Sequence, residues 1–116
     1  ITAQGVAEAL TLANRAGLDV QQVQQAMMGG MASSRVLDFF GDRMARRDFS
    51  AGIESRLYHK DLDIVMQLAH SLGVSLPAGA VTMQFVNGLY GQRRGTDDLS
   101  SLITLLESLG ERSSTK

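Results

Sequence analysis

The stretch SRLYHKDLDIVMQLAHSLG, Ser55–Gly73, has the most regular helical pattern in the chain. Apolar side chains recur along it every three or four residues, which is the spacing of one face of an α-helix. The predicted apolar face comprises Leu57, Val65, Leu68 and Leu72, with Tyr58, Leu62 and Ala69 beside it. We therefore expect a long helix that packs this face into the core. It should end at Gly73, because glycine readily adopts the left-handed conformation of a helix C-terminus.

Two neighbouring charges, Lys60 and Asp61, interrupt this pattern. Asp61 lies four residues after Leu57 and four before Val65, where a core helix needs an apolar residue. An unpaired buried charge is strongly unfavourable, so we expect Asp61 to accept hydrogen bonds from loop amides or from an arginine. Adjacent residues do not face each other on a helix, so Lys60 needs a partner of its own. From this pattern, Lys60 is either a surface lysine whose stem covers apolar atoms or a residue that contacts a ligand.

Five further segments of the 116-residue chain predict helices, at about 2–16, 19–28, 34–44, 78–91 and 98–109. Their expected N-caps are Asp19 in a capping box with Gln22, one of Ser33 and Ser34, and one of Asp97 and Asp98. The aspartate pair could instead bind a cation, but the capping role needs no further hypothesis. Residues 45–54 lack periodicity and predict a loop anchored by Phe49 and Ile53. Because no segment alternates with a period of two, we expect an all-α fold of about six helices.

Composition limits the function classes. Apolar residues make up 44% of the chain, which permits a packed core. The net charge of −1, with dispersed basic residues, argues against nucleic acid or an acidic membrane as the main partner. The absence of cysteine excludes disulfides, thiolate metal sites and a cysteine nucleophile. The sequence also lacks the roughly 20 consecutive apolar residues of a membrane span, and we predict a cytoplasmic protein.

Common motifs for phosphate and metal binding do not occur in this sequence. It contains neither a GxGxxG turn after a strand, nor GxxxxGK[ST], nor HExxH. His59 and His70 would lie about 16 Å apart along one helix, so they cannot share a metal ion, and we predict no metal site. Asp63 follows His59 by four residues, and we expect these two to form a solvated surface pair.

The segment HKDLDIVMQLAHSLGVSLP, residues 59–77, resembles the C-terminal helical domain of the β-hydroxyacid dehydrogenases, the family that includes the 3-hydroxyisobutyrate dehydrogenases. Four further segments resemble the family in the same order. They are Glu8–Leu10 with Ala16–Leu18 (EAL…AGL), Gly29–Gly30 with Ser34 and Leu37 (GG…S..L), Arg47–Phe49 with Gly52 (RDF..G), and Asp98–Leu102 (D-x-S-x-L). The resemblance covers nearly the whole chain. It implies a helical bundle like the C-terminal domain of 6-phosphogluconate dehydrogenase.

This resemblance implies NAD(P)-dependent interconversion of a small β-hydroxy acid and its aldehyde or keto form. Within the family, the GG…S loop and the KDL helix look most like those of tartronate semialdehyde (2-hydroxy-3-oxopropionate) reductases. By resemblance, Lys60 contacts the NAD or NADP cofactor near the nicotinamide, and Ser34 lies on the substrate side. Ile53 stands where the family has phenylalanine in its GF pair. The choice between NAD and NADP depends on groups near the ribose 2′ position, which this sequence does not contain.

The resemblance also implies a domain organisation. Residues 1–110 would form a C-terminal, substrate-side and oligomerisation domain, truncated at its N-terminus, and residues 111–116 a polar tail. The family's catalytic lysine, in a GxxxKxxN motif, would lie upstream of Ile1, so we assign no catalytic residue and expect this chain alone to be inactive. Its expected partners are a small hydroxy acid and further copies of itself, which would associate through apolar surface on the first helix. The alternative is a non-catalytic helical interaction module, whose Met- and Ala-rich faces pack on partner helices.

Overall fold

The computed structural model describes residues 1–110, which form helices and connecting loops. Six α-helices run in the order α1 (Thr2–Arg15), α2 (Val20–Met28), α3 (Asp42–Arg46), α4 (Ser55–Leu72), α5 (Pro77–Gly91) and α6 (Leu102–Leu109). A π-helical segment, η1 (Leu37–Gly41), precedes α3, and a 3-10 turn, η2 (Leu99–Ser101), precedes α6. This confirms the expected all-α fold. The predicted polar tail, residues 111–116, falls outside the described residues.

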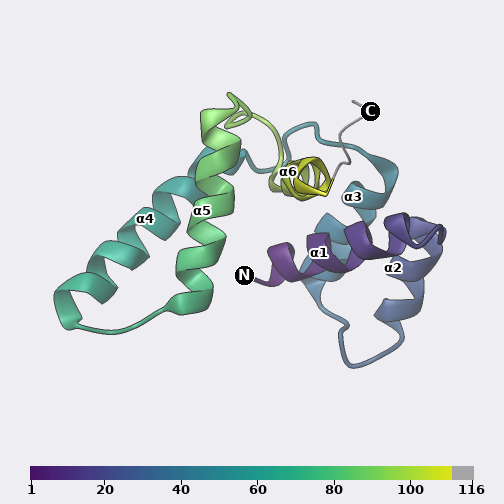
Figure 1. Ribbon diagram of the computed structural model, residues 1–116, viewed down its shortest axis with the longest axis horizontal. Coiled ribbons are helices and arrows are strands. Elements are labelled where there is room, and N and C mark those ends of the chain that lie inside the picture. The colour runs from purple at the N-terminus through teal and green to yellow at the C-terminus, as the bar shows by residue number, and fades with distance from the viewer. Residues whose placement is uncertain (111–116) are drawn as a thin grey trace, which may run out of the picture.

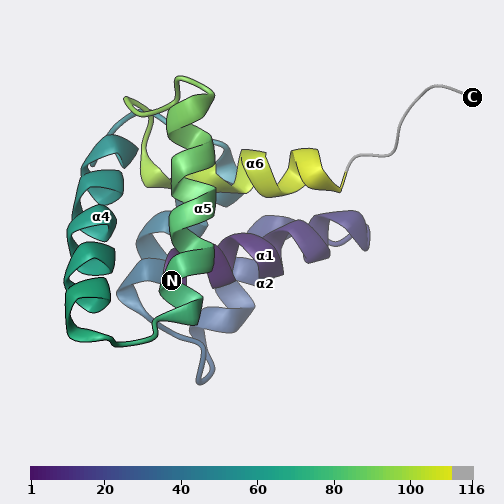
Figure 2. The same ribbon diagram turned by 60° about the vertical axis from the view of Figure 1, so that its left-hand side comes forward.

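The helices are arranged as a body and a projecting hairpin (Figure 1). Helices α1, α2, α3 and α6 pack together, whereas α4 and α5 lie antiparallel beside them (Figure 2). The hydrophobic core lies between the body and α5, and it contains Ala3, Val6, Ala7, Leu10, Leu37, Phe40, Met44, Val86, Leu99 and Ile103. In the described part of the chain, none of the helices has the length and apolar character that crossing a membrane requires.

Three of the predicted helix caps are present. Asp19 Oδ1 accepts a hydrogen bond from the Gln22 amide at 3.0 Å, and Ser34 Oγ accepts one from the Leu37 amide at 2.9 Å. Asp98 Oδ2 accepts one from the Ser100 amide, also at 3.0 Å. Each side chain satisfies an N–H group that has no carbonyl partner in the first turn of its helix.

The third predicted helix contains a feature that the sequence did not predict, the π-helical turn at Leu37–Gly41. A Cβ atom at Gly41 would lie only 3.2 Å from side-chain atoms of Gln24 and Leu37, so glycine permits the close approach of this turn to α2. The wider turn changes the direction of the side chains that it carries. Phe40 is buried in the core, whereas the neighbouring Phe39 is 48% exposed.

The apolar face predicted for α4 is not buried in this structure. Leu57, Val65, Leu68 and Leu72 are between 41% and 67% exposed. The inward-facing residues are those predicted beside that face: Tyr58 and Leu62 pack against the core, and Ala69 is buried. The prediction was wrong because α4 is apolar over more than one face, and its main neighbour within the described residues is α5 alone.

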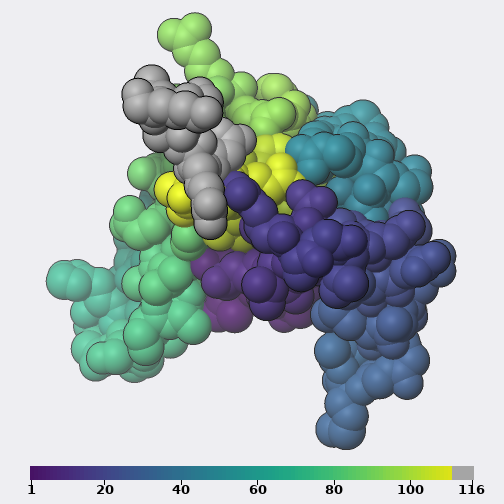
Figure 3. Space-filling view, turned by 45° about the vertical axis from the view of Figure 1, so that its right-hand side comes forward, coloured from purple at the N-terminus to yellow at the C-terminus, as the bar shows by residue number. Residues whose placement is uncertain are grey.

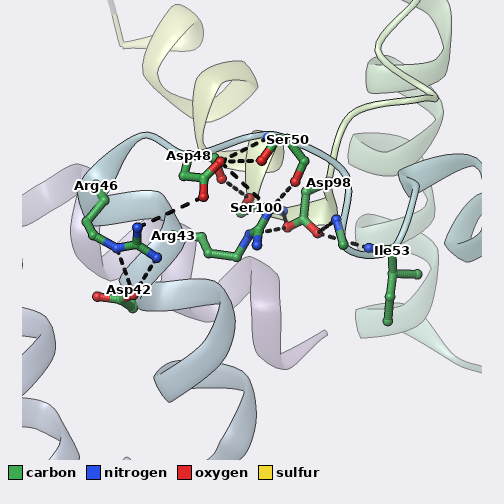
Figure 4. Close-up of polar contacts among 9 residues, drawn as sticks. Asp42, Arg43, Arg46, Asp48, Ser50, Ile53, Asp98 and Ser100 are labelled. Carbon is green, nitrogen blue, oxygen red and sulfur yellow. Dashed lines mark hydrogen bonds and ion pairs between the residues drawn. The ribbon is translucent and has the colours of Figure 1, made fainter.

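Asp98 is a fully buried carboxylate that joins separate segments of the chain (Figure 4). Its Oδ1 accepts hydrogen bonds from the backbone N–H groups of Gly52 and Ile53, both at 3.2 Å. Its Oδ2 lies 3.4 Å from Arg43 Nε, in addition to capping the turn at Ser100. A buried charge requires this density of donors, because it has lost its contact with water.

The same network fixes the loop between α3 and α4, residues 47–54. The Arg43 guanidinium also donates to the Ser50 carbonyl, and the Asp98 amide donates to the Phe49 carbonyl at 3.0 Å. Phe49 is partly buried against the core, as predicted for an anchor. Ile53 is not a side-chain anchor, since it is 44% exposed and is held through its backbone N–H instead.

We expect Asp98→Ala to lower the free energy of unfolding by about 3–5 kcal/mol, because the largely buried Arg43 side chain and three amides lose their acceptor. The matched control is Asp97→Ala. The partly exposed Asp97 carboxylate pairs with Arg94 at 3.1 Å, and a pair of this kind contributes no more than about 1 kcal/mol. Urea denaturation followed by circular dichroism measures both values. Equal losses in the two variants would contradict the role assigned to Asp98.

Candidate functional site

Lys60 lies on the exposed side of α4. Its neighbours on the same helix face, Leu57 and Ile64, are exposed as well. Within the described residues, Lys60 forms no ion pair. Its ammonium group is therefore free to contact a group outside residues 1–110.

Ser34 ends the loop that follows α2, and this loop protrudes from the body (Figure 3). At the tip of the loop, Met31 is fully exposed. Ser34 itself is only partly exposed, and its Oγ caps the next helical segment through the Leu37 amide. One acceptor position of the hydroxyl is occupied in this way, while its hydrogen remains available for donation.

A hollow of about 300 Å³ lies between the start of α4 and the segment that follows Ser34. It is lined by Arg35, Val36, Phe39, Phe40, Ile53 and Tyr58, and is called the aromatic hollow below. Arg35 follows Ser34 directly, and Tyr58 precedes Lys60 by two residues. Neither Ser34 nor Lys60 lines this hollow, so the structure does not bring the two predicted residues together in it.

Tyr58 is a titratable residue that lines the aromatic hollow. Burial raises the pKa of the Tyr58 hydroxyl, and the negative charges of Asp98 and Asp61 raise this pKa further. Its ring packs edge-on against Phe40, with 6.2 Å between the ring centroids. The hydroxyl is therefore protonated at neutral pH and can donate a hydrogen bond.

A second cavity, of about 230 Å³, separates the N-terminal end of α1 from the hairpin. Gln4 lines it, and the buried Gln4 Oε1 has no hydrogen-bond partner among the described residues. Ligand sites commonly occupy about 300–1,000 Å³. Both cavities are at or below the lower end of that range.

Two predictions for the charged residues of α4 are wrong. Asp61 is exposed, and no loop amide or arginine of residues 1–110 donates to it; the buried carboxylate with that environment is Asp98. His59 does not pair with Asp63. Instead, its Nε2 donates to Asn87 Oδ1 at 3.0 Å and its ring stacks on Tyr90, so His59 links α4 to α5.

The buried role of Asp98 was not predicted from the sequence. Asp98 was expected as a helix cap or, with Asp97, as a possible cation site, because the sequence does not show that the Gly52 and Ile53 amides reach its other oxygen. Within the described residues, no cluster of three or more His, Asp or Glu side chains has a geometry that could hold a metal ion.

Comparison with known proteins shows the family to which this chain is related. Residues 1–106 match the family described as NAD-binding of NADP-dependent 3-hydroxyisobutyrate dehydrogenase. The chain is 39% identical over 104 residues to 2-hydroxy-3-oxopropionate reductase of Escherichia coli, covering 90% of this chain and 36% of that protein. It is 34% identical to a probable 3-hydroxyisobutyrate dehydrogenase-like protein of Arabidopsis thaliana, covering 93% of this chain and 32% of that one.

The fold comparison agrees with the sequence match. The crystal structure of 3-hydroxyisobutyrate dehydrogenase from Salmonella typhimurium superposes with a TM-score of 0.85 at 21% identity, covering 89% of this chain and 36% of that one. The chain thus spans about a third of the length of these relatives. It belongs to the 3-hydroxyisobutyrate dehydrogenase family of NAD(P)-dependent enzymes, in which it corresponds to the C-terminal helical domain.

Proposed function

We propose that this chain is the substrate-side and oligomerisation domain of a dehydrogenase that transfers a hydride between NAD(P) and a small 3-hydroxy acid or its semialdehyde. The supporting observation is the family match over residues 1–106, with the family's lysine position exposed and unpaired at Lys60. The sequence identity of 39% to the Escherichia coli reductase makes 2-hydroxy-3-oxopropionate the first substrate to test. A cytoplasmic location remains part of this proposal.

In this proposal the described residues bind and position the cofactor and the substrate, and they take no part in the chemical step themselves. The bound NAD or NADP supplies or accepts the hydride. Lys60 holds the cofactor through its ammonium group, and the Asp98–Arg43 network keeps Ile53 in a fixed position at the edge of the aromatic hollow. The helical domain excludes water from the reacting groups when it covers the substrate.

Lys60→Ala should weaken cofactor binding in a protein that joins this chain to its nucleotide-binding domain. We expect a rise of about tenfold in KM for the cofactor, equivalent to about 1.4 kcal/mol. The thermal midpoint should not change, because the Lys60 side chain is exposed. Arg93→Ala, which removes another exposed cation, is the control. Unchanged KM and kcat in Lys60→Ala would show that Lys60 is a surface lysine that does not contact the cofactor.

The 116-residue chain by itself should not reduce 2-hydroxy-3-oxopropionate with NADH or NADPH. These residues match about a third of the length of their relatives and contain no GxxxKxxN motif, so they do not supply the lysine that would exchange the alcohol proton. Loss of nicotinamide absorbance, recorded at high protein concentration, measures this activity. Turnover above the rate without protein would refute the expectation.

The apolar face of α4 should make the chain self-associate. This face consists of Leu57, Ile64, Val65, Leu68 and Leu72, all exposed in the structure. Sedimentation velocity should show association that increases with concentration and is lost in Leu68→Lys. Leu12→Lys on α1 is the comparison, because Leu12 is also exposed and α1 is the helix that the sequence predicted to associate. Loss of association in Leu12→Lys instead of Leu68→Lys would assign the interface to α1. A monomer at all concentrations would exclude this interface.

The same exposed face favours the alternative function, a non-catalytic module that packs on a partner helix. The coding sequence upstream of Ile1 separates the two proposals. A GxGxxG strand–turn–helix followed by a KxxN motif supports the dehydrogenase. An unrelated domain, or a start codon at residue 1, supports the module.

A further inference from the structure

Helix α4 begins without a capping side chain. The residue before it, Glu54, forms no side-chain hydrogen bond to the first turn. Backbone carbonyls from a distant segment accept from the first-turn amides instead. The Ser55 amide donates to the Asp97 carbonyl at 2.8 Å, and the Arg56 amide donates to the Gly95 carbonyl at 2.9 Å. The loop between α5 and η2 therefore takes the place of an N-cap for α4.

Two buried side chains strengthen this attachment. The Ser55 side chain lies in the first turn of α4, and its hydroxyl donates to the Arg94 carbonyl at 2.8 Å. The Asp98 carboxylate holds the residues immediately before α4, because it accepts from the amides of Gly52 and Ile53. Both sets of hydrogen bonds join the start of α4 to the same loop, the one that leads from α5 to η2.

The position of Lys60 depends on how α4 starts. Lys60 lies five residues after Ser55, which is about 7.5 Å along the helix axis. Its side chain forms no ion pair within the described residues, so only the helix backbone determines where the ammonium group lies. Beyond its first turn α4 packs mainly on α5, and α5 leads into the loop that holds the start of α4. A shift at this loop therefore moves the Lys60 ammonium group.

We propose that Ser55 and Asp98 are positioning residues for Lys60, which hold α4 in the orientation that brings the Lys60 ammonium group to the cofactor. This inference rests on the proposed function, in which Lys60 binds NAD or NADP. Ser55 and Asp98 are buried within this chain and act through the helix, without touching the cofactor. Their removal should therefore weaken cofactor binding only while Lys60 is present.

The test is a double-mutant cycle in a protein that joins this chain to its nucleotide-binding domain. The Kd for NADH and for NADPH is measured by titration of nicotinamide fluorescence. Ser55→Ala should raise the Kd for the bound cofactor about threefold, and Asp98→Asn should raise it by at least as much. In the Lys60→Ala background neither substitution should raise this Kd further, because the residue that they position is absent.

Gln24→Ala is the matched control for a general loss of stability. The buried Gln24 side chain donates to the Leu37 carbonyl at 3.2 Å, and its helix α2 packs on α1, α3 and η1. This variant should have a lower thermal midpoint and an unchanged Kd. Circular dichroism melts show which variants are folded at the assay temperature. Ser55→Ala, which loses a single hydrogen bond, carries the test if Asp98→Asn does not fold.

Hydrogen exchange of the ¹⁵N-labelled 116-residue chain measures the attachment of α4 without the cofactor. Ser55→Ala and Asp98→Asn should both speed exchange of the Arg56 amide, which donates to the loop. The Val74 amide donates to the Ala69 carbonyl at the far end of α4, and its exchange should change less. Equal changes at Arg56 and Val74 would contradict the assigned local role.

The cycle separates this inference from the proposed function. An equal rise in Kd with and without Lys60, or no rise in Ser55→Ala and Asp98→Asn while Lys60→Ala binds weakly, would overturn the inference. An unchanged Kd in Lys60→Ala would overturn it too, since Lys60 would then have no cofactor to meet. Cofactor binding that shows the expected coupling, in a protein that does not turn over hydroxy acids, would reject the dehydrogenase and retain the inference.

Discussion

The carboxylate of Asp98 has no contact with solvent, and its charge is compensated by donors from two other parts of the chain. Arg43 comes from α3, and the Gly52 and Ile53 amides come from the loop before α4. A buried carboxylate that lost any of these donors would be strongly unfavourable, so the three segments must keep their relative positions. The aromatic hollow depends on this constraint, because Ile53 and the Arg43 guanidinium over the Phe39 ring both belong to the network.

The α4–α5 hairpin is attached to the body next to this Asp98 network. The Ser55 amide donates to the Asp97 carbonyl at 2.8 Å, and the Ser55 hydroxyl donates to the Arg94 carbonyl at 2.8 Å. The Arg56 amide donates to the Gly95 carbonyl at 2.9 Å. The first turn of α4 is therefore bound to the loop that leads from α5 to Asp98. The hairpin is fixed at this end, which is also the end that carries Tyr58 and Lys60.

The sequence was sufficient for the features that depend on neighbouring residues. Helix periodicity predicted the helices, and short polar side chains predicted the caps at Asp19 and Ser34. It was not sufficient for the features that depend on distant residues. The π-helical turn at Leu37–Gly41 reflects packing against Gln24, and Asp98 meets loop amides 45 and 46 residues away in the chain. Periodicity also could not show which apolar face of α4 meets α5.

The exposed face of α4 explains the position of Asp61. In this structure Asp61 is solvated, so the charge needs no partner even though it interrupts an apolar stripe. A surface that covered Leu57 and Val65 would also remove water from Asp61, which lies between them on the same helix face. Burial of that carboxylate without a donor would offset much of the free energy gained from the apolar contacts. Any partner of this face therefore has to present a cation or N–H groups opposite Asp61, or leave that position open to water.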